Sequence, residues 1–384
     1  MSASPPPVVR VSTLIVGAGP AGLAVAAGLA ARGRPYTIVE RGARVAESWH
    51  HHYDRLCLHT VKELSALPGL GFPEHYPRYV PREQLAAYYG AYATHHGIEP
   101  RFGVEVTAIL RSGSGWRVEV AEGAAFDADA VVLATGVNRV PVRPTFRGES
   151  SFQGTIEHSR SYRRPDPYRG RRVLIVGMGN TGAEIALDLC DAGVDVALSV
   201  RGPVNIVPRE VWGRPTQRTA ILLGRLPEGL GDRLGVLLRR LTVGDLSRWG
   251  IRTPALPPVR QLRLQGKTPV IDLGTVAHIR AGRIPVHGAV DRFVPEGVTF
   301  QGGRTAPFDA VLLATGYRPG VESFFADTDG LLDRNGLPGF VVGTGRWEGL
   351  FLVGFDAYQP GGVLRTIVGQ SRAVVEALDA RGVV

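Results

Sequence analysis

The chain has 384 residues, of which 44% are hydrophobic, and its formal net charge at pH 7 is +9. This composition allows large cores and more than one domain, and no apolar run approaches the length of a bilayer span. Lysine occurs only at Lys62 and Lys267, so nearly all the positive charge is arginine, spread along the chain. Because no basic block is interleaved with aromatic residues, a nucleic-acid partner is not expected.

The cysteines and the N-terminus bear on where the protein works. Cys57 and Cys190 are the only cysteines, and they lie far apart in the sequence. Residues 1–7 have neither the basic nor the apolar segment of a signal peptide. We therefore expect a cytoplasmic protein without a disulfide framework. The sequence is compatible with a homodimer and does not decide the oligomeric state.

Two glycine-rich loops are the most informative features of the sequence. One begins at Gly17, after an apolar run at 11–16, and the other begins at Gly177, after an apolar run at 173–176. In such a loop the first glycine permits a tight turn into a helix, the second lets a pyrophosphate approach, and the third lets helix and strand pack closely. The helix N-terminus offers its N–H groups to the phosphates. The residues predicted to hold two dinucleotides are Gly17, Gly19, Pro20, Ala21 and Gly22 in the first loop, and Gly177, Gly179, Asn180, Thr181 and Gly182 in the second.

The residue that would contact the ribose differs between the two loops. The strand after the first loop ends in Glu40, whose carboxylate would accept hydrogen bonds from ribose hydroxyls and repel a 2′-phosphate. The strand after the second loop, at 194–200, is followed by Arg201, whose guanidinium suits a 2′-phosphate. The first loop therefore favours FAD or NAD, and the second favours NADPH.

The remaining elements follow in chain order. Residues 44–82 are polar, aromatic and proline-rich, and are expected to form a long functional loop. A helix is expected at 81–96 and strands at 101–110 and 115–121, the strands forming a β-meander against the sheet.

A repeated Ala-Thr-Gly segment indicates the domain boundaries. It ends one apolar run at 130–136 and recurs at 314–316, after another apolar run. We expect an α/β protein with two doubly wound Rossmann-like dinucleotide-binding domains, the NADPH domain being inserted into the FAD domain. The expected domains are 1–145 for FAD, 146–316 for NADPH and 317–384 for the rest of the FAD domain.

Residues 211–250 form an amphipathic insertion in the second domain. Leucines recur there at steps of three and four, with arginines between them. This pattern favours two amphipathic helices packed on the domain. A substrate-access lid or a weak membrane-surface contact stays open.

The stretch from Phe152 to Tyr162 carries a family signature. It matches the motif FxGxxxHxxxY of class B flavin monooxygenases, in the flavin-containing monooxygenase branch. The chain resembles this family almost end to end. It is most similar to the YUCCA-type enzymes of plants, which convert indole-3-pyruvate to indole-3-acetate, through the stretches 53–59, 207–210, 266–274 and 313–317.

The resemblance implies a monooxygenase that uses FAD, NADPH and dioxygen on a small organic substrate. In this family NADPH reduces FAD, dioxygen adds to flavin C4a, and the (hydro)peroxide so formed attacks the substrate. The resemblance adds Glu40, Arg41, Trp49, His59, Val106, Thr135, Gly136, Arg201, Gly354 and Gly362 to the cofactor-binding residues, and implies catalytic roles for His59, Asn180 and Tyr162. Trp49 and His59 would lie near the isoalloxazine, although His59 is also compatible with a structural role.

Several chemistries stay open at this point. Oxygen could go to an amine or sulfide heteroatom, or it could drive the YUCCA-like oxidative decarboxylation of an aryl 2-oxo acid. Baeyer–Villiger oxygenation, an NADPH oxidase or dehydrogenase without oxygen transfer, and a redox sensor are the alternatives. No metal is expected, because the adjacent side chains at 50–52 would face different ways.

Overall fold

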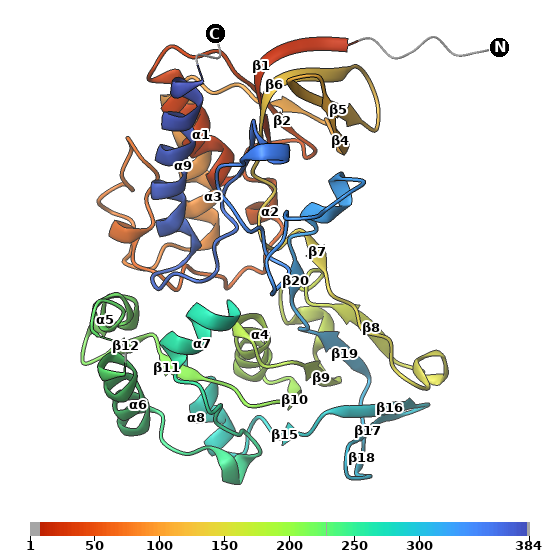
Figure 1. Cartoon of the computed structure of the whole chain (residues 1–384). Coiled ribbons are helices and arrows are strands. Elements are labelled where there is room, and N and C mark those ends of the chain that lie inside the picture. The colour runs from red at the N-terminus through yellow and green to blue at the C-terminus, as the bar shows by residue number, and fades with distance from the viewer. Residues whose placement is uncertain (1–7, 228, 382–384) are drawn as a thin grey trace, which may run out of the picture. The chain divides into compact units, whose positions relative to one another are not determined.

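The computed structural model describes residues 8–227 and 229–381, so the leader expected at 1–7 lies outside the described residues. The chain forms two compact units. In the described residues, the first unit comprises 8–51, 60–140 and 318–381, and the second comprises 52–59 and 141–317 apart from residue 228. Figure 1 shows the elements of each unit. The chain passes between the units on either side of 52–59, and again within the short strands β7 (Val140–Pro141) and β20 (Tyr317–Arg318).

The first unit is built on a seven-stranded sheet of order β3-β2-β1-β6-β5-β4, with β21 also paired to β6. Strands β3, β2, β1 and β6 are parallel, whereas β6, β5 and β4 are antiparallel neighbours. The strands are β1 (Val8–Val16), β2 (Thr37–Glu40), β3 (Arg101–Phe102), β4 (Val106–Ser112), β5 (Gly115–Val120), β6 (Ala125–Leu133) and β21 (Leu350–Leu352). The helices are α1 (Pro20–Ala30), α2 (Glu47–His50), α3 (Arg82–His95) and α9 (Val363–Ala380).

Strand β6 explains a difference from the expected meander. It is nine residues long and pairs with β1 over nearly its whole length, while its first half also pairs with β5. The meander is therefore part of the main sheet and not a layer against it. The single strand expected at 101–110 is also two strands, β3 and β4.

The second unit contains a five-stranded parallel sheet of order β15-β10-β9-β19-β8. Its strands are β8 (Thr155–His158), β9 (Arg172–Val176), β10 (Asp195–Ser199), β15 (Val286–His287) and β19 (Ala310–Leu313). Smaller sheets pair β11 (Ile206–Pro208) with β14 (Val270–Asp272), β12 (Glu210–Val211) with β13 (Arg214–Pro215), and β17 (Gly297–Phe300) with both β16 (Val290–Val294) and β18 (Thr305–Pro307). The helices are α4 (Asn180–Asp191), α5 (Thr216–Leu223), α6 (Leu230–Thr242), α7 (Pro258–Gln265) and α8 (Thr275–Arg280).

The two sheets repeat one local arrangement. In the first sheet, β1 precedes the glycine loop and lies between β2 and β6, and β6 precedes an Ala-Thr-Gly segment. In the second sheet, β9 precedes the glycine loop and lies between β10 and β19, and β19 precedes the other Ala-Thr-Gly segment. Continuous apolar runs form these strands because both of their faces are covered, and residues 174–175 and 14–15 are fully buried. The expected mixed α/β class with parallel, Rossmann-type sheets is thereby confirmed.

The amphipathic insertion differs from its expected packing. Helices α5 and α6 form where the leucine spacing predicts helices. However, α6 buries only Gly231, and its leucines at 230, 234, 237 and 241 are exposed. The expectation that this leucine stripe packs on the domain is wrong. In the described ranges, no helix is both long and apolar enough to cross a bilayer.

Candidate functional site

The first glycine loop, between β1 and α1, has the geometry that its sequence predicts. Gly17 has a φ of 108°, and a Cβ there would lie 2.7 Å from the carbonyl oxygen of Ala134. A Cβ on Gly22 would lie 1.9 Å from the carbonyl oxygen of Gly17. A Cβ on Gly19 would meet nothing within 4 Å. The first and third glycines are thus required by the fold itself, whereas the second leaves open space at the start of α1.

The second glycine loop, between β9 and α4, repeats this geometry. Gly177 also has a φ of 108°, and a Cβ there would lie 2.5 Å from the carbonyl oxygen of Ala314. A Cβ on Gly182 would lie 2.1 Å from the carbonyl oxygen of Gly177, while a Cβ on Gly179 would meet nothing within 4 Å. Two separate units of the chain therefore offer the same cradle for a pyrophosphate.

The two Ala-Thr-Gly segments lie directly beside these loops. The Ala134 N–H donates to the Val16 carbonyl at 2.9 Å, and the Ala314 N–H donates to the Val176 carbonyl at 2.9 Å. The buried Thr135 hydroxyl has no hydrogen-bond partner in the described part of the chain. Because an unsatisfied buried hydroxyl is costly, it fits a loop whose ligand supplies the missing bond.

Glu40 is held in place at the carboxyl edge of the first sheet. Its Oε2 accepts a hydrogen bond from the Ala18 N–H at 2.9 Å, and its Oε1 accepts one from the Gly42 N–H at 2.8 Å. Each carboxylate oxygen keeps a second lone pair, so the group can still accept from a ribose hydroxyl. These bonds fix the carboxylate beside the first loop.

Arg201 occupies the corresponding place in the second unit. It follows β10, whose last residue, Ser199, accepts a hydrogen bond from the Gly177 N–H at 2.9 Å. Arg201 is exposed, and its carbonyl accepts a bond from the Arg252 guanidinium at 3.4 Å. An exposed cationic residue thus lies two positions after the residue that anchors the loop.

Further sequence-predicted residues of the first unit lie in or beside several of its elements. Pro20 is the first residue of α1, where its missing N–H costs nothing. Gly354 has a φ of 84°, its N–H donates to Gln370, and a Cβ there would lie 2.9 Å from the Cβ of Ala21. Gly362 has a φ of 88° and directly precedes α9, as expected. The others are Arg41 after β2, Trp49 in α2, Val106 at the start of β4, and Gly136 after Ala-Thr.

His59 contacts a residue that sequence reasoning missed. His59 Nε2 lies 2.5 Å from Glu184 Oε1, and the Glu184 side chain is only 2% exposed. The second oxygen, Glu184 Oε2, is buried and has no hydrogen-bond partner in the described residues. Burial, and next the charge of Glu184, raise the pKa of the nearby Tyr53 well above its ordinary value. The signal in the sequence was an acidic residue within the apolar run at 182–187.

Asn180 is engaged with the backbone of β14. Its Oδ1 accepts a hydrogen bond from the Ile271 N–H at 2.7 Å, and its Nδ2 donates to the Pro269 carbonyl at 3.4 Å. The side chain therefore ties the first turn of α4 to the segment at 269–271. This contact accounts for the amide at this position of the loop.

The beginning of the FxGxxxHxxxY motif packs on the second sheet. The Phe152 ring lies 5.3 Å from that of Phe293, between centroids. A Cβ on Gly154 would lie 2.5 Å both from the carbonyl oxygen of Asp309 and from the Phe152 ring. These two positions of the motif are thus fixed by close packing.

The end of the motif is fixed by hydrogen bonds. His158 Nδ1 accepts from the Arg160 N–H at 3.1 Å, so its Nε2 donates to the Gly316 carbonyl at 3.2 Å. Tyr162 is 1% exposed, and its hydroxyl donates to Asp188 at 2.7 Å. Burial, and next this hydrogen bond, raise the pKa of Tyr162 far above its ordinary value. Asp188 is a second functional partner that the sequence did not reveal.

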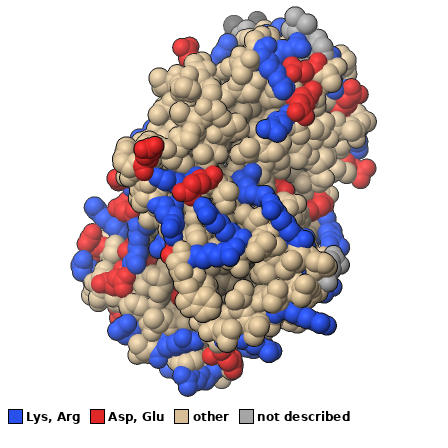
Figure 2. All heavy atoms as spheres, turned by 90° about the vertical axis from the view of Figure 1, so that its left-hand side faces the viewer, with Lys and Arg blue, Asp and Glu red and all other residues tan. Residues whose placement is uncertain are grey.

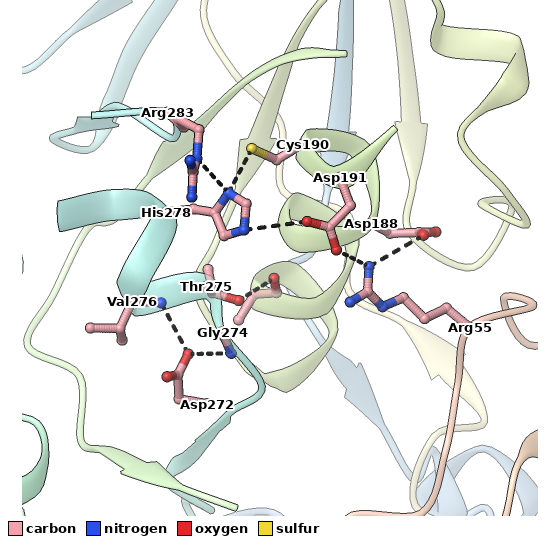
Figure 3. Close-up of polar contacts among 11 residues, drawn as sticks. Arg55, Asp188, Cys190, Asp191, Asp272, Gly274, Thr275, Val276, His278 and Arg283 are labelled. Atoms are coloured by element: carbon pink, nitrogen blue, oxygen red, sulfur yellow. Dashed lines mark hydrogen bonds and ion pairs between the residues drawn. The ribbon is translucent and has the colours of Figure 1, made fainter. Parts of the chain in front are cut away.

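Helix α4 is tied to its surroundings by a polar network (Figure 3). The Thr275 hydroxyl donates to the Ala183 carbonyl at 2.9 Å, which joins α8 to α4. Cys190 Sγ lies 3.1 Å from His278 Nδ1, and His278 Nε2 lies 3.3 Å from Asp191. Arg55 donates to Asp191 at 2.7 Å. The network fixes the helix that begins at the second glycine loop.

The residues present fit two dinucleotides. Each glycine loop has open space at its second glycine, and the first has an unsatisfied buried hydroxyl beside it. The sequence contains no CxxC pair that could serve as a redox disulfide. The fold and the site define an oxidoreductase that works with a flavin and a pyridine nucleotide and without a catalytic disulfide.

Comparisons with known proteins agree with this class. A family described as pyridine nucleotide-disulphide oxidoreductase matches residues 14–217. The chain is 42% identical to the indole-3-pyruvate monooxygenase YUCCA1 of Oryza sativa subsp. japonica, over 89% of this chain and 86% of that protein. It is 40% identical to the YUCCA4 enzyme of the same plant, over 96% and 88%. In structure it is similar to a flavin-containing monooxygenase from Stenotrophomonas maltophilia, with a TM-score of 0.74, 23% identity, and coverage of 97% and 99%.

The chain belongs to the YUCCA-type family of class B flavin monooxygenases. It is a monooxygenase that depends on FAD and NADPH, as its motifs predict. The predicted family, enzyme class and cofactors are thereby confirmed.

Proposed function

We propose that the first unit binds FAD and the second binds NADPH, so that the NADPH unit is inserted into the FAD unit. This assignment is supported by the fixed carboxylate of Glu40 beside one loop and the exposed guanidinium of Arg201 beside the other. The site residues are those predicted from the sequence, together with Glu184 and Asp188. Both cysteines are free, which suits work in the cytoplasm.

The substrate that we propose is indole-3-pyruvate. The observation that carries this choice is the 42% identity, over 89% of the chain, to an enzyme named for that substrate. The balanced reaction joins indole-3-pyruvate, NADPH, dioxygen and one proton to give indole-3-acetate, carbon dioxide, NADP⁺ and water. When bound, the flavin accepts two electrons from NADPH and activates dioxygen, so the protein contributes binding, orientation and protection from water.

In this proposal His59 holds a proton close to the reacting groups, where the family resemblance places it. Its Nε2 is committed to Glu184, which leaves Nδ1 as the nitrogen that can face a reactant. The Glu184 carboxylate is only 2% exposed, so its contact with Nε2 holds the imidazole ring in one orientation. Asn180 positions the second loop, and Tyr162 braces α4 through Asp188.

The test is a coupled assay on the purified flavoprotein. Indole-3-pyruvate should stimulate NADPH oxidation, with indole-3-acetate formed in equal amount and little hydrogen peroxide. Trimethylamine, methyl phenyl sulfide and cyclohexanone, run in parallel, represent N-oxidation, S-oxidation and Baeyer–Villiger oxygenation. Faster, well-coupled turnover of any of these would overturn the proposed substrate. NADPH use matched fully by hydrogen peroxide with all of them would contradict oxygen transfer.

A further inference from the structure

Helix α6 carries an apolar stripe on its exposed side. Its leucines at 230, 234, 237 and 241 follow one another at steps of four, three and four, so they share one side of the helix. Their exposed fractions are 50%, 38%, 52% and 69%. About a quarter turn from the stripe, α6 packs against α5 at Gly231, where a Cβ would lie 2.4 Å from the carbonyl oxygen of Leu223. The stripe is therefore turned away from the core of its own unit.

Neighbouring elements of the second unit add apolar groups of the same kind. Leu222 of α5 is 47% exposed and Leu264 of α7 is 40% exposed, and both helices pack against α6. Trp212, at the tip of the β12–β13 hairpin, is 89% exposed with a φ of 49°. An exposed tryptophan in a left-handed backbone conformation contributes nothing to the core. We call these three residues and the four leucines of α6 the leucine face.

The same segment holds most of the net positive charge of the chain. Residues 211–266 contain ten arginines and three acidic residues, one of them the undescribed residue 228, and so carry seven of the nine net charges. Arginines are spread along the chain as expected, but outside this segment acidic residues nearly balance them. Figure 2 shows basic side chains gathered over the lower half of the side on which α5 and α6 lie in Figure 1. Among the described residues, Arg225, Arg233 and Arg240 have no acidic partner within 4 Å.

We propose that the leucine face and its arginines dock on an anionic lipid surface. Leucine and tryptophan side chains would enter the interfacial layer, while the arginines contact headgroup phosphates. With 13 residues, four of them charged, α6 is too short and too polar to span a bilayer. It therefore lies along the surface, as a peripheral contact.

Charge complementarity favours a lipid surface over a second copy of this chain or a nucleic acid. A two-fold dimer through this face would set the arginines of both copies against one another, and the centres of such interfaces are depleted of charge. A nucleic acid would meet a row of leucines where stacking aromatic groups are needed. Only a lipid surface satisfies the apolar stripe and the basic flanks together.

The test uses the full flavin-loaded chain and vesicles. Vesicles of phosphatidylcholine with about a third phosphatidylserine should carry the protein in flotation at low salt. Pure phosphatidylcholine vesicles should carry far less, and high salt should release the bound protein. Trp212 emission should shift to the blue on binding, and the shift should be lost in Trp212→Phe. Equal binding to both kinds of vesicle, or to neither, would overturn the proposal.

Variants separate the two parts of the contact. Arg233→Gln with Arg240→Gln should weaken binding about 25-fold, because each arginine near an anionic surface contributes roughly fivefold to the affinity. Leu237→Gln with Leu241→Gln should weaken it about tenfold or more. These positions are exposed, so the variants should fold with unchanged flavin content.

Matched controls come from exposed residues elsewhere. Leu110 on β4 is 38% exposed, and Arg304 and Arg334 are exposed outside the segment. Leu110→Gln and the pair Arg304→Gln with Arg334→Gln should bind vesicles as the wild type does. If the controls lose binding equally, or if the leucine pair only converts a dimer into a monomer in light scattering, the proposal fails.

Discussion

His59 and Glu184 form a pair that joins the loop segment at 52–59 to the interior of α4, with Nε2 and Oε1 2.5 Å apart. Glu184→Gln keeps the shape and replaces the carboxylate that contacts Nε2 with an amide. We expect kcat to fall about 10- to 100-fold, which is part of the roughly 10²- to 10⁴-fold that a positioned proton-transfer group contributes. The pH dependence of kcat should also change, and it can be measured between pH 6 and 9.

The control for this prediction lies one turn along the same helix. Asp188 contacts Tyr162 and not His59, so Asp188→Asn should lower stability while the pH profile keeps its shape. His59→Gln should reproduce the loss of kcat. An unchanged profile in Glu184→Gln would show that the pair is purely structural.

Substituting the second glycine of each loop should impair cofactor binding while the protein still folds. Gly19→Ala places a methyl group where nothing lies within 4 Å, so the protein should fold but lose flavin absorbance. Gly179→Ala should retain flavin and bind NADPH weakly. Gly22→Ala is the contrasting variant, because its Cβ would lie 1.9 Å from a carbonyl oxygen, and we expect a loss of about 3 kcal/mol of stability or more. Normal flavin content in Gly19→Ala would contradict the first-loop assignment.

Arg201 should discriminate between the two nicotinamide cofactors. Arg201→Ala removes a charge-assisted contact with the 2′-phosphate, for which we expect a loss of about 1.5–3 kcal/mol. The Kd for NADPH should rise about 10- to 150-fold, while that for NADH stays nearly constant. Stopped-flow measurement of flavin reduction at varied cofactor concentration gives both values. Equal losses for the two cofactors would argue against this residue as the reader of the phosphate.

Tyr162 should contribute to the stability of the fold and not to catalysis. Its hydroxyl bonds to Asp188 at 2.7 Å in a buried place, so Tyr162→Phe should cost about 2 kcal/mol in the free energy of unfolding. Tyr168 is also buried, but its hydroxyl lies 3.5 Å from Glu157, so Tyr168→Phe should cost less than about 1 kcal/mol. Urea unfolding compares the two. A large loss of kcat in Tyr162→Phe with unchanged stability would assign the residue to catalysis.

The sequence predicted what local geometry determines. The glycine at 17 is readable because a strand-to-helix turn needs its positive φ, and the glycine at 22 because the helix touches the loop. The partner of His59 was not readable, since it lies 125 positions away and is fixed only by the packing of α4. The leucine spacing in α6 correctly predicted a helix, but the leucines were expected to be buried and they are exposed. Periodicity places apolar residues on one face and does not say what that face meets.

His287 should make stability depend on pH. Burial, and next the charge of Arg304, lower its pKa from the ordinary 6.5. The folded protein therefore resists protonation, so the stabilisation is complete above about pH 6.5 and is lost as the pH falls through the lower, folded pKa. The ring stacks on Phe300 with centroids 4.3 Å apart, a place that His287→Phe can fill. Between pH 7.5 and 5, the Tm of the variant should fall about 2–4 °C less than that of the wild type. Parallel Tm curves would refute the role of His287, because the other histidines are common to both proteins.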